Sequence, residues 1–379
     1  MAAILNVRAT VRRYALPQAF AAELVRLLDD HVNEIHSRTR VSRSVLSVKT
    51  QERRTTALCS AFVELRGGGF ALESPWSLRE KHVRWLVARW VSDKQSGGTI
   101  ENKLTYLRAL SQWIGKPALV RTLGDYVDRA EHGLKRSYVA TTDRSWSSNE
   151  IDAAAKIAEI AQTCPYVAIQ LKLQAAFGLR VEESFLLRPL EAVRDAQTLG
   201  IRRGTKGGLA REVPLEAKVG VLEEAARLSN GTTGSTVPAD RTLKQWRDWY
   251  YYVLERHGVT KAELGVTSHG LRHEYLQVLY EKISGVPAPI KGSDARAERG
   301  LHEQAMQRVV AAAGHTRKTK ANAYLSVFGL KERLERQRRP QPSAAEVERA
   351  LQDNAGNKSH AAAALGISRQ ALYRILGGS

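Results

Sequence analysis

Cysteine is almost absent from this sequence: Cys59 and Cys164 are the only two among 379 residues. Neither belongs to a CxxC motif or to a cluster of cysteines and histidines, so neither a disulfide framework nor a zinc site is supported. Long apolar runs are absent too, and none approaches the roughly 18 residues of a membrane-spanning helix. The first 20 residues are interrupted by Arg8, Arg12 and Arg13, which is not typical of a secretory signal. We therefore expect a cytoplasmic chain with no membrane partner, no metal and no cofactor.

Acidic residues are scarce relative to basic ones. The chain has 58 lysines and arginines against 39 aspartates and glutamates, a formal net charge of +19. Such an excess in a globular composition indicates a polyanionic partner, and it favours nucleic acid over an acidic membrane surface or a merely basic soluble protein. The length allows two or three domains, each with a buried core.

The N-terminal part of the sequence predicts a bundle of short helices. Apolar residues recur at helical spacing in four stretches, residues 16–35, 47–69, 77–98 and 99–115. We expect Ser77 and Glu80 to form a capping box at the start of the third helix, and Thr99 to cap the fourth. The expected division is a helical extension over 1–45, a helical domain over 46–120 and a linker over 121–146.

Basic side chains are spread over the expected outer faces of these helices. For any one of them a solvated position is the ordinary interpretation, whereas together they suit a surface that lies along phosphates. The set comprises Arg53, Arg54, Arg84, Arg89, Lys94, Lys103 and Arg108, of which Arg84, Arg89, Lys103 and Arg108 are our DNA-binding candidates. Whether residues 1–45 also bind DNA stays open, because their charge is modest.

The end of the chain, residues 343–379, predicts three short helices separated by glycines at 356 and 366. Two short helices joined by a glycine turn form a helix-turn-helix, whose last helix enters the major groove of DNA. The stretch GNKSHAAAALGISRQALYRIL resembles the Fis-type helix-turn-helix over its whole length. The alternative is a helical tail that contacts another protomer, because fewer than about 40 residues make a marginal domain. The candidate base-reading residues are Arg369, Gln370, Tyr373 and Arg374.

The segment from 147 to 339 is predicted to be mainly helical, opened by a capping box of Ser147 and Glu150. One exception is residues 199–215, where alternation on both sides of a glycine-rich turn predicts a β-hairpin. Another feature is the aromatic stretch 241–258, which suggests a base-stacking surface, although aromatic residues at helical spacing more often form core.

Two short motifs in this segment place charged groups that suit phosphate chemistry. Glu183 follows Arg180 by one helical turn and can hold its guanidinium group. His269, Arg272 and His273 lie at i, i+3 and i+4, which gathers them on one helical face. The two histidines have the spacing of paired zinc ligands, but the motif lacks the glutamate of HExxH and places a cation between them.

His315 and Tyr324 are nine residues apart, which on one unbroken helix would place them on opposite faces. The polar stretch HTRKT and a cap at Thr319 predict a break between them, so that both can approach one point. A tyrosine is a poor nucleophile at its free pKa near 10, so an attacking tyrosine needs cations close by.

At this point the sequence resembles the tyrosine recombinases, also called phage-type integrases. The resemblance is loose over the N-terminal helices and good over 147–330. FGLRVEE resembles the family's first arginine box with Phe177 in place of Thr, HGLRH its HxLRH box, and AGHTRKTKANAY its last box with Ala313 in place of Leu. TKGGLAREVPL resembles the hairpin that carries the family's lysine, here Lys206. The implied fold is mainly α: a helical, SAM-like core-binding domain, a mostly α catalytic domain with a small β-hairpin, and the C-terminal helix-turn-helix.

The resemblance also implies a reaction. Tyr324 would attack a DNA phosphorus to give a 3′-phosphotyrosine, Arg180 and Arg272 would brace the phosphate, Lys206 would protonate the leaving 5′-oxygen, and His269 and His315 would handle protons; Glu183 and His273 would support them. Expected partners are double-stranded DNA, a homotetramer on synapsed DNA and accessory DNA-bending proteins, at the nucleoid.

The expected function is integration or excision of a mobile element. Two alternatives stay open, a non-catalytic DNA-binding regulator and a strand transferase of the topoisomerase or telomere-resolvase kind. Residues 284–302 look like an insertion of unknown role, and whether Tyr324 is docked without DNA is also open.

Overall fold

The computed structural model describes residues 5–36, 45–192, 197–205, 208–216, 218–293, 295–330, 342–367 and 369–376. The chain divides into two compact units, Met1–Ser137 and Tyr138–Ser379. Within the described ranges, both units are helical apart from one two-stranded hairpin, so the expected mainly α fold class is confirmed. In the same ranges no helix combines the length and apolar character needed to cross a membrane.

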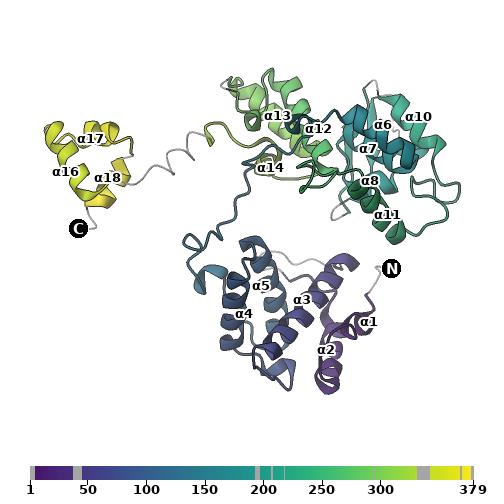
Figure 1. Ribbon diagram of the computed structural model, residues 1–379, viewed down its shortest axis with the longest axis horizontal. Helices are drawn as coiled ribbons and strands as arrows, with labels where there is room; N and C mark the ends of the chain where they lie inside the picture. Colours follow the sequence, from purple (N-terminus) through teal and green to yellow (C-terminus); the bar gives the residue numbers. More distant parts are fainter. Residues whose placement is uncertain are drawn as a thin grey trace. The chain divides into compact units, whose positions relative to one another are not determined.

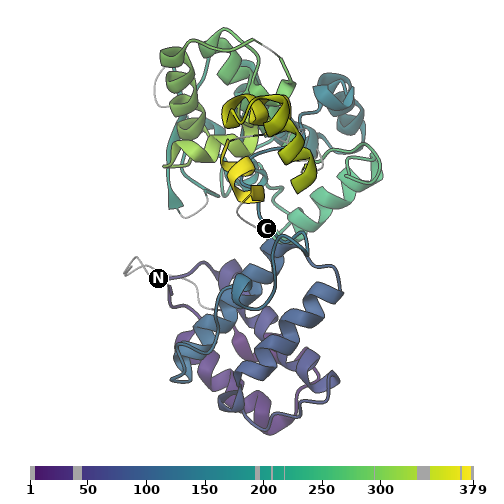
Figure 2. The same ribbon diagram turned by 90° about the vertical axis from the view of Figure 1, so that its left-hand side faces the viewer.

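The N-terminal unit, drawn from purple to blue in Figures 1 and 2, is a bundle of helices around one core. Residues of all five α-helices contribute to that core, among them Leu24, Leu58, Val83 and Leu104. The segment expected to be an extension therefore packs with the rest of the unit. The elements are α1 Val7–Val11, α2 Gln18–His31, α3 Val48–Gly67, η1 Pro75–Ser77, α4 Glu80–Ser92, α5 Gly97–Trp113 and η2 Leu123–Asp125.

Two of the expected caps in this unit are wrong. Ser77 ends the short turn η1, which Ser74 caps by accepting from the amide of Trp76, and α4 begins after Arg79. At the start of α5 the cap is Ser96, whose hydroxyl accepts from the amide of Thr99 at 3.2 Å. For α5 the cap therefore lies three residues upstream of the expected Thr99, and for α4 it lies two residues downstream of the expected Ser77.

The second unit begins with residues 138–149 and continues through a series of helices that is interrupted by the hairpin. The expected capping box of Ser147 and Glu150 is wrong: Glu150 adopts a left-handed conformation with φ 58°, and Asp152 caps the first long helix. The elements up to the hairpin are η3 Ser147–Asn149, α6 Ala153–Thr163, α7 Pro165–Phe177, α8 Val181–Leu186 and α9 Pro189–Ala192. After the hairpin come α10 Val219–Arg227, α11 Leu243–Arg256, α12 His269–Ser284, η5 Pro289–Lys291, α13 Arg299–Ala312, η6 Lys318–Ala321 and α14 Asn322–Leu325.

The predicted hairpin is present as β1 Thr198–Ile201 and β2 Arg211–Pro214, paired antiparallel with Leu199 opposite Val213. One hydrophobic core joins this hairpin to α7, α12, α13 and α14. A second core lies around α6 and α11, where Trp246 and Tyr250 are completely buried. The aromatic stretch is therefore mainly core, as the helical spacing favoured, although Tyr251 and Tyr252 remain half exposed.

The last three helices are α16 Ala344–Asp353, α17 Lys358–Ala364 and α18 Arg369–Leu376. Ser343 and Glu346 form a capping box on α16, and Asn357 caps α17. Ala350, Ala361 and Ala362 are buried against Val347 and Leu372. Because these alanine side chains are small, the three helices can approach closely. These helices thus have a small core of their own.

Candidate active site

Arg180 owes its position to the glycine that ends α7. Gly178 has φ 60°, and a Cβ added there would lie 2.3 Å from the ring of Tyr275, so both the backbone angle and the space require glycine. The chain reverses at this residue, and Arg180 becomes the cap of α8. Its amide donates to the Glu183 carboxylate at 2.6 Å, which fixes the arginine and the glutamate relative to each other.

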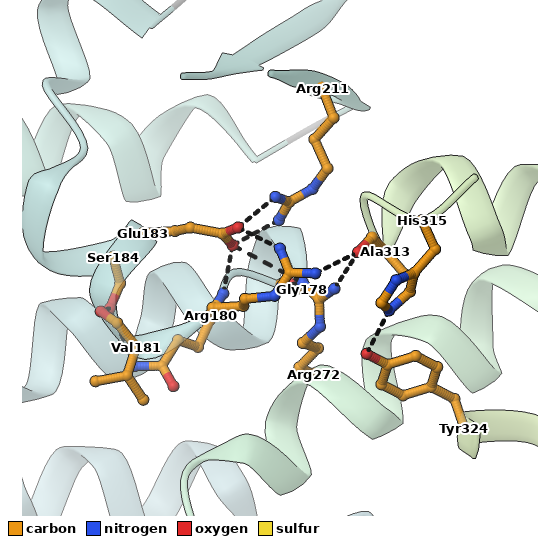
Figure 3. A network of polar contacts seen from close by, with 11 residues as sticks. Gly178, Arg180, Val181, Glu183, Ser184, Arg211, Arg272, Ala313, His315 and Tyr324 are labelled. Atoms are coloured by element: carbon orange, nitrogen blue, oxygen red, sulfur yellow. Dashed lines mark hydrogen bonds and ion pairs between the residues drawn. The ribbon is translucent and has the colours of Figure 1, made fainter. Parts of the chain in front are cut away.

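Glu183 is completely buried and lies at the centre of a cluster of three arginines (Figure 3). Its carboxylate accepts from Arg180 at 2.6 Å and from both terminal nitrogens of Arg211 at 2.5 and 2.6 Å, and Arg272 lies 3.8 Å away. Burial alone would raise the pKa of Glu183, but the hydrogen bonds and charge of Arg211, together with Arg180, lower it to about 2. The predicted contact between Arg180 and Glu183 is therefore present, as part of a larger group.

Arg211 is the member of this cluster that the sequence analysis did not single out. Its signal was the alternation of β2, in which Arg211 and Val213 are buried and Glu212 between them is exposed. A charged residue on the apolar face of a strand needs a partner, since burying an unpaired charge is costly.

The backbone oxygen of Ala313 brings the two predicted arginines together. Arg180 and Arg272 each donate a terminal N–H to this one carbonyl, both at 2.7 Å. Arg272 is completely buried and also donates to the carbonyl of Gly178. Two guanidinium groups that converge on one oxygen are arranged as a phosphate oxygen requires.

His315 and Tyr324 meet, as the predicted break allows. The helix α13 ends at Ala312, Gly314 turns the chain with φ 60°, and η6 leads into the short helix α14 that carries the tyrosine. The imidazole Nε2 of His315 lies 3.4 Å from the Tyr324 hydroxyl (Figure 3). The expected cap at Thr319 is wrong, because Thr319 lies inside η6 and Arg317 precedes that turn.

Tyr324 is docked against the core in this structure, with only 7% of its surface exposed. The guanidinium carbon of Arg272 lies 5.7 Å from the centre of its ring. His273 and His269 follow on the same side of α12, with ring centres 4.9 and 6.3 Å from that of Tyr324. The structure thus gathers seven of the eight residues predicted for the site, including Glu183.

The eighth residue, Lys206, lies outside the described residues. In the sequence it falls between β1 and β2.

The two histidines of α12 are held in their neutral form. Burial, with the charges of Arg272 and Arg180, lowers the pKa of His269 to about 4. Burial, with His269 and Arg144, lowers the pKa of His273 to about 3. At neutral pH both can donate or accept hydrogen bonds without adding charge. No group of three or more potential metal ligands from His, Cys, Asp and Glu occurs within the described ranges.

The DNA-binding candidates of the N-terminal unit lie on α4 and α5. Arg84 and Arg89 are exposed and pair with Glu80 and Asp93 one turn away, at 2.6 and 3.0 Å. Lys103 lies 3.6 Å from Glu64 and above the ring of Trp90, and Arg108 donates to the carbonyl of Arg121 at 3.1 Å.

Arg54, which we expected on an outer face, is buried instead. It donates to the carbonyls of Val32 and Glu34, both at 3.0 Å, and thereby closes the end of α2 against α3. Its role in the unit is structural.

On α18 the side chains of Arg369, Gln370 and Tyr373 are exposed, as expected for a base-reading helix. The ammonium group of Lys358 lies 4.9 Å from the centre of the Tyr373 ring. The side chain of Arg374 lies outside the described part of the structure.

Comparison with known protein families gives two matches. Residues 133–278 match the model described as Integrase, and residues 343–376 match the model described as Bacterial regulatory protein, Fis family. The first match includes Arg180 and Arg272 but ends before His315 and Tyr324. A comparison with curated proteins finds no match.

Solved structures with a similar fold include a lambda integrase dimer bound to a COC′ core site. It is 15% identical, has a TM-score of 0.51, and the similarity covers 79% of this chain and 94% of that one. The XerH site-specific recombinase bound to palindromic difH substrate is 16% identical, with a TM-score of 0.48 and coverage of 87% and 92%. The Tn1549 transposon integrase in complex with transposon right end DNA is 13% identical, with a TM-score of 0.47 and coverage of 83% and 99%.

Residues 133–278 thus resemble the integrase family, and the fold is similar to that of the lambda integrase structure. The predicted resemblance to the tyrosine recombinases, with a Fis-type helix-turn-helix at the end of the chain, is thereby confirmed.

Proposed function

We propose that this chain is a site-specific DNA recombinase that cleaves and rejoins DNA through a 3′-phosphotyrosine. The observation that carries the proposal is the convergence of two arginines and a histidine beside a buried tyrosine. Arg180 and Arg272 share the Ala313 oxygen at 2.7 Å, and His315 lies 3.4 Å from the Tyr324 hydroxyl. The match to the integrase family over 133–278 supports the same reaction.

Cleavage begins when the Tyr324 hydroxyl oxygen attacks a DNA phosphorus and loses its proton. The new bond joins that oxygen to phosphorus, and the bond from phosphorus to the 5′-oxygen breaks. Arg180 and Arg272 donate to the non-bridging oxygens, whose negative charge grows in the transition state. The phosphotyrosine conserves the energy of the broken bond, so the same steps in reverse rejoin DNA without ATP or a metal.

Protons move through the remaining residues. His315 is the group nearest to the Tyr324 hydroxyl and accepts or shares its proton. His269 is neutral at pH 7, because its pKa is about 4, and hydrogen-bonds the phosphate without charge. Lys206 protonates the leaving 5′-oxygen, a role that rests on the family resemblance. Glu183 holds Arg272 in place, and His273 holds Tyr324 in place.

The remainder of the chain serves DNA binding. Arg84, Arg89, Lys103 and Arg108 lie along the phosphate backbone, and α18 reads a second site in the major groove. Four copies act together on two duplexes, because exchange requires four strands to be cut. The element served by the reaction is a mobile one, integrated or excised with help from DNA-bending proteins.

The test is capture of the covalent intermediate. A pool of duplexes with a randomised centre is nicked a short distance 3′ of the expected cleavage, so that the short 5′-hydroxyl fragment leaves and rejoining fails. Wild type is expected to give a protein–DNA adduct that survives denaturation, and sequencing of the bound strands gives the target. Tyr324→Phe is expected to give none, while Tyr251→Phe, which changes a half-exposed tyrosine on α11, is expected to match wild type.

The result decides between the proposal and its alternatives. A wild type without adduct would favour a DNA-binding regulator, and an adduct from Tyr324→Phe would mean that another residue attacks. A topoisomerase would relax supercoiled plasmid that lacks the selected sequence, whereas the recombinase is expected to act only on plasmid that contains it.

A further inference from the structure

The helix that carries Tyr324 has partners outside the family boxes. Two parts of the chain contact it, which we name the 138–148 segment and the η5 loop, residues 285–293. The amide of Ala140 donates to the carbonyl of Asn322 at 2.8 Å, and the ammonium of Lys320 lies 4.8 Å from the centre of the Tyr138 ring. In the η5 loop, the turn η5 packs against α14. A helix of four residues cannot form alone, so contacts of this kind determine where it lies.

Gln277 connects the 138–148 segment to the backbone of the tyrosine itself. It lies on α12 with 2% of its surface exposed. Its amide nitrogen donates to the Asp143 carboxylate at 2.9 Å and to the carbonyl of Tyr324 at 3.3 Å. Both partners accept only, so the two N–H bonds of one amide group are the chemistry that this position requires.

Asp143 is held as an anion by four donors. Its carboxylate accepts from the amide of Ser145 at 2.9 Å, the hydroxyl of Ser148 at 2.6 Å, Gln277, and the ammonium of Lys291 at 3.0 Å. Burial alone would raise the pKa of Asp143, but these hydrogen bonds together lower it well below its usual range. A carboxylate that stays charged keeps a strong acceptor in front of Gln277.

Lys291 brings the η5 loop into the same network. Its ammonium group has three N–H bonds, and it has three acceptors at hydrogen-bond distance: Asp143 at 3.0 Å, the Ser145 hydroxyl at 3.0 Å and the Ser148 hydroxyl at 2.8 Å. The side chain is 29% exposed, so this is a partly enclosed site. By contrast Lys282, near the end of α12, pairs with Glu216 at 2.8 Å and is 64% exposed.

We propose that Asp143, Gln277 and Lys291 are positioning residues that hold Tyr324 in its docked place. Lys291 fixes Asp143, Asp143 orients Gln277, and Gln277 binds the Tyr324 carbonyl. The η5 loop, which is part of the stretch 284–302 that looked like an insertion, thus supplies a support for the nucleophile. Attack on phosphorus depends on placement to within about 1 Å, so loss of this support slows cleavage. Its effect on cleavage rests on the proposed function, whereas the placement of α14 belongs to the protein without DNA.

The first experiment measures amide hydrogen exchange of the full-length chain without DNA. Gln277→Met and Lys291→Met are expected to exchange about tenfold faster over residues 320–326 and to match wild type over α6 and α7. Lys282→Met is the matched control and is expected to change neither region. Unchanged exchange over 320–326 would overturn the proposal, and so would a uniform rise over the whole second unit, which a merely structural role predicts.

The second experiment measures the rate of adduct formation on the nicked duplexes, with DNA affinity measured separately. Both variants are expected to cleave about tenfold more slowly with unchanged affinity, and Lys291→Arg to recover most of the rate. Because the residues act in one chain of contacts, the double variant is expected to be no slower than the slower single one. Wild-type rates in both single variants would overturn the proposal. A wild type that forms no adduct would defeat the proposed function, and the exchange result would still decide where α14 is held.

Discussion

Two groups of arginines in this chain show opposite ways of using the same side chain. Arg180, Arg211 and Arg272 crowd around one buried carboxylate, and their partners come from residues as far as 133 positions away in the sequence. Arg84 and Arg89 lie exposed on one helix, each paired with an acid four residues away. Buried ion pairs must offset a large desolvation cost with complete hydrogen bonding, whereas exposed pairs cost and contribute little. Position therefore decides what each arginine can do.

The buried group is not neutral. Three guanidinium groups share one carboxylate, three positive charges against one negative, and carbonyl oxygens of Gly178 and Ala313 complete the contacts. An excess of positive charge in a low-dielectric place is unfavourable for stability and favourable for binding an anion. The cluster thus has the concentrated positive charge that suits a phosphate site. The exposed arginines provide only a diffuse positive surface.

The largest effect is expected from Glu183→Gln, which removes the common anion of the buried group. Leaving three arginines without their carboxylate is expected to lower the free energy of unfolding by about 3–5 kcal/mol. Chemical denaturation followed by fluorescence measures it. Glu182→Gln is the matched control, because Glu182 is a partly exposed neighbour paired with Arg247 at 3.0 Å, and its loss is expected to stay within about 1 kcal/mol. Equal losses in the two variants would show that the buried group has no special energetics.

Local spacing explains which parts of this group could be predicted from the sequence. Arg180 and Glu183 are three residues apart, and His269, Arg272 and His273 share one helical turn, so helix geometry alone places them together. Arg211 and the Ala313 carbonyl come from a strand and a helix end far away in the sequence. No periodicity links Arg211 to Glu183 or Asp143 to Gln277, because those contacts depend on how α12, β2 and the 138–148 segment pack.

The starts of helices were predicted less well than their cores. Ser77, Thr99 and Ser147 all had the residue types of a cap, but Arg79, Ser96 and Asp152 hold the capping positions. Before α5 and α6, several serines, threonines and aspartates compete for a capping position, and such caps differ by only about 1 kcal/mol. The helix α4 instead begins after Arg79, whose amide donates to the imidazole of His82 at 3.0 Å. Apolar spacing has no such competition, which is why the buried faces of α4 and α5 were predicted correctly.

Lowering the pH is expected to reduce the free energy of unfolding through the buried histidines beside Tyr324. His273 has a pKa of about 3 when folded and 6.5 when unfolded, so the unfolded state binds the proton first as the pH falls below 6.5. At pH 5 this costs the folded state about 2 kcal/mol. Denaturant unfolding at pH 7 and pH 5 is expected to show a smaller loss for His273→Gln than for wild type, by about that amount.

The range from pH 7 to pH 5 separates the effect of the histidines on stability from that of the carboxylates. The pKa of Glu183 is lowered from 4.5 to about 2, so its contribution to stability is fully present at pH 5 and is lost only below about 4.5. Burial also lowers the pKa of His36 and His82 in the N-terminal unit, so variant and wild type are compared rather than the two units. An identical loss in both proteins would mean that His273 is not kept neutral.

The helix-turn-helix is an intermediate case between the buried and the exposed arginine groups, because it has a core of its own and an exposed arginine, Arg369. Its helices α16, α17 and α18 have their own small core, so deletion of residues 342–379 is expected to leave the melting temperature of the remainder unchanged. DNA affinity, measured by fluorescence anisotropy at fixed salt, is expected to fall about tenfold as one of the linked contacts is lost. Arg369→Ala keeps the fold and tests the exposed face of α18 separately. A drop in melting temperature would indicate that these helices pack on the remainder and serve stability.

The smallest effect is expected from Arg84→Ala. The ion pair between Arg84 and Glu80 is exposed, so stability is expected to change by less than about 0.5 kcal/mol. If Arg84 contacts a phosphate, the slope of log affinity against log salt is expected to fall by about 0.9. Glu80→Gln is the informative partner change, because it releases Arg84 from its local pair and is expected to leave the slope intact. An unchanged slope in Arg84→Ala would mean that this arginine contacts no phosphate and only stabilises α4. The comparison would then rest on the charge of the buried arginines, and not on a contact with DNA that both groups of arginines make.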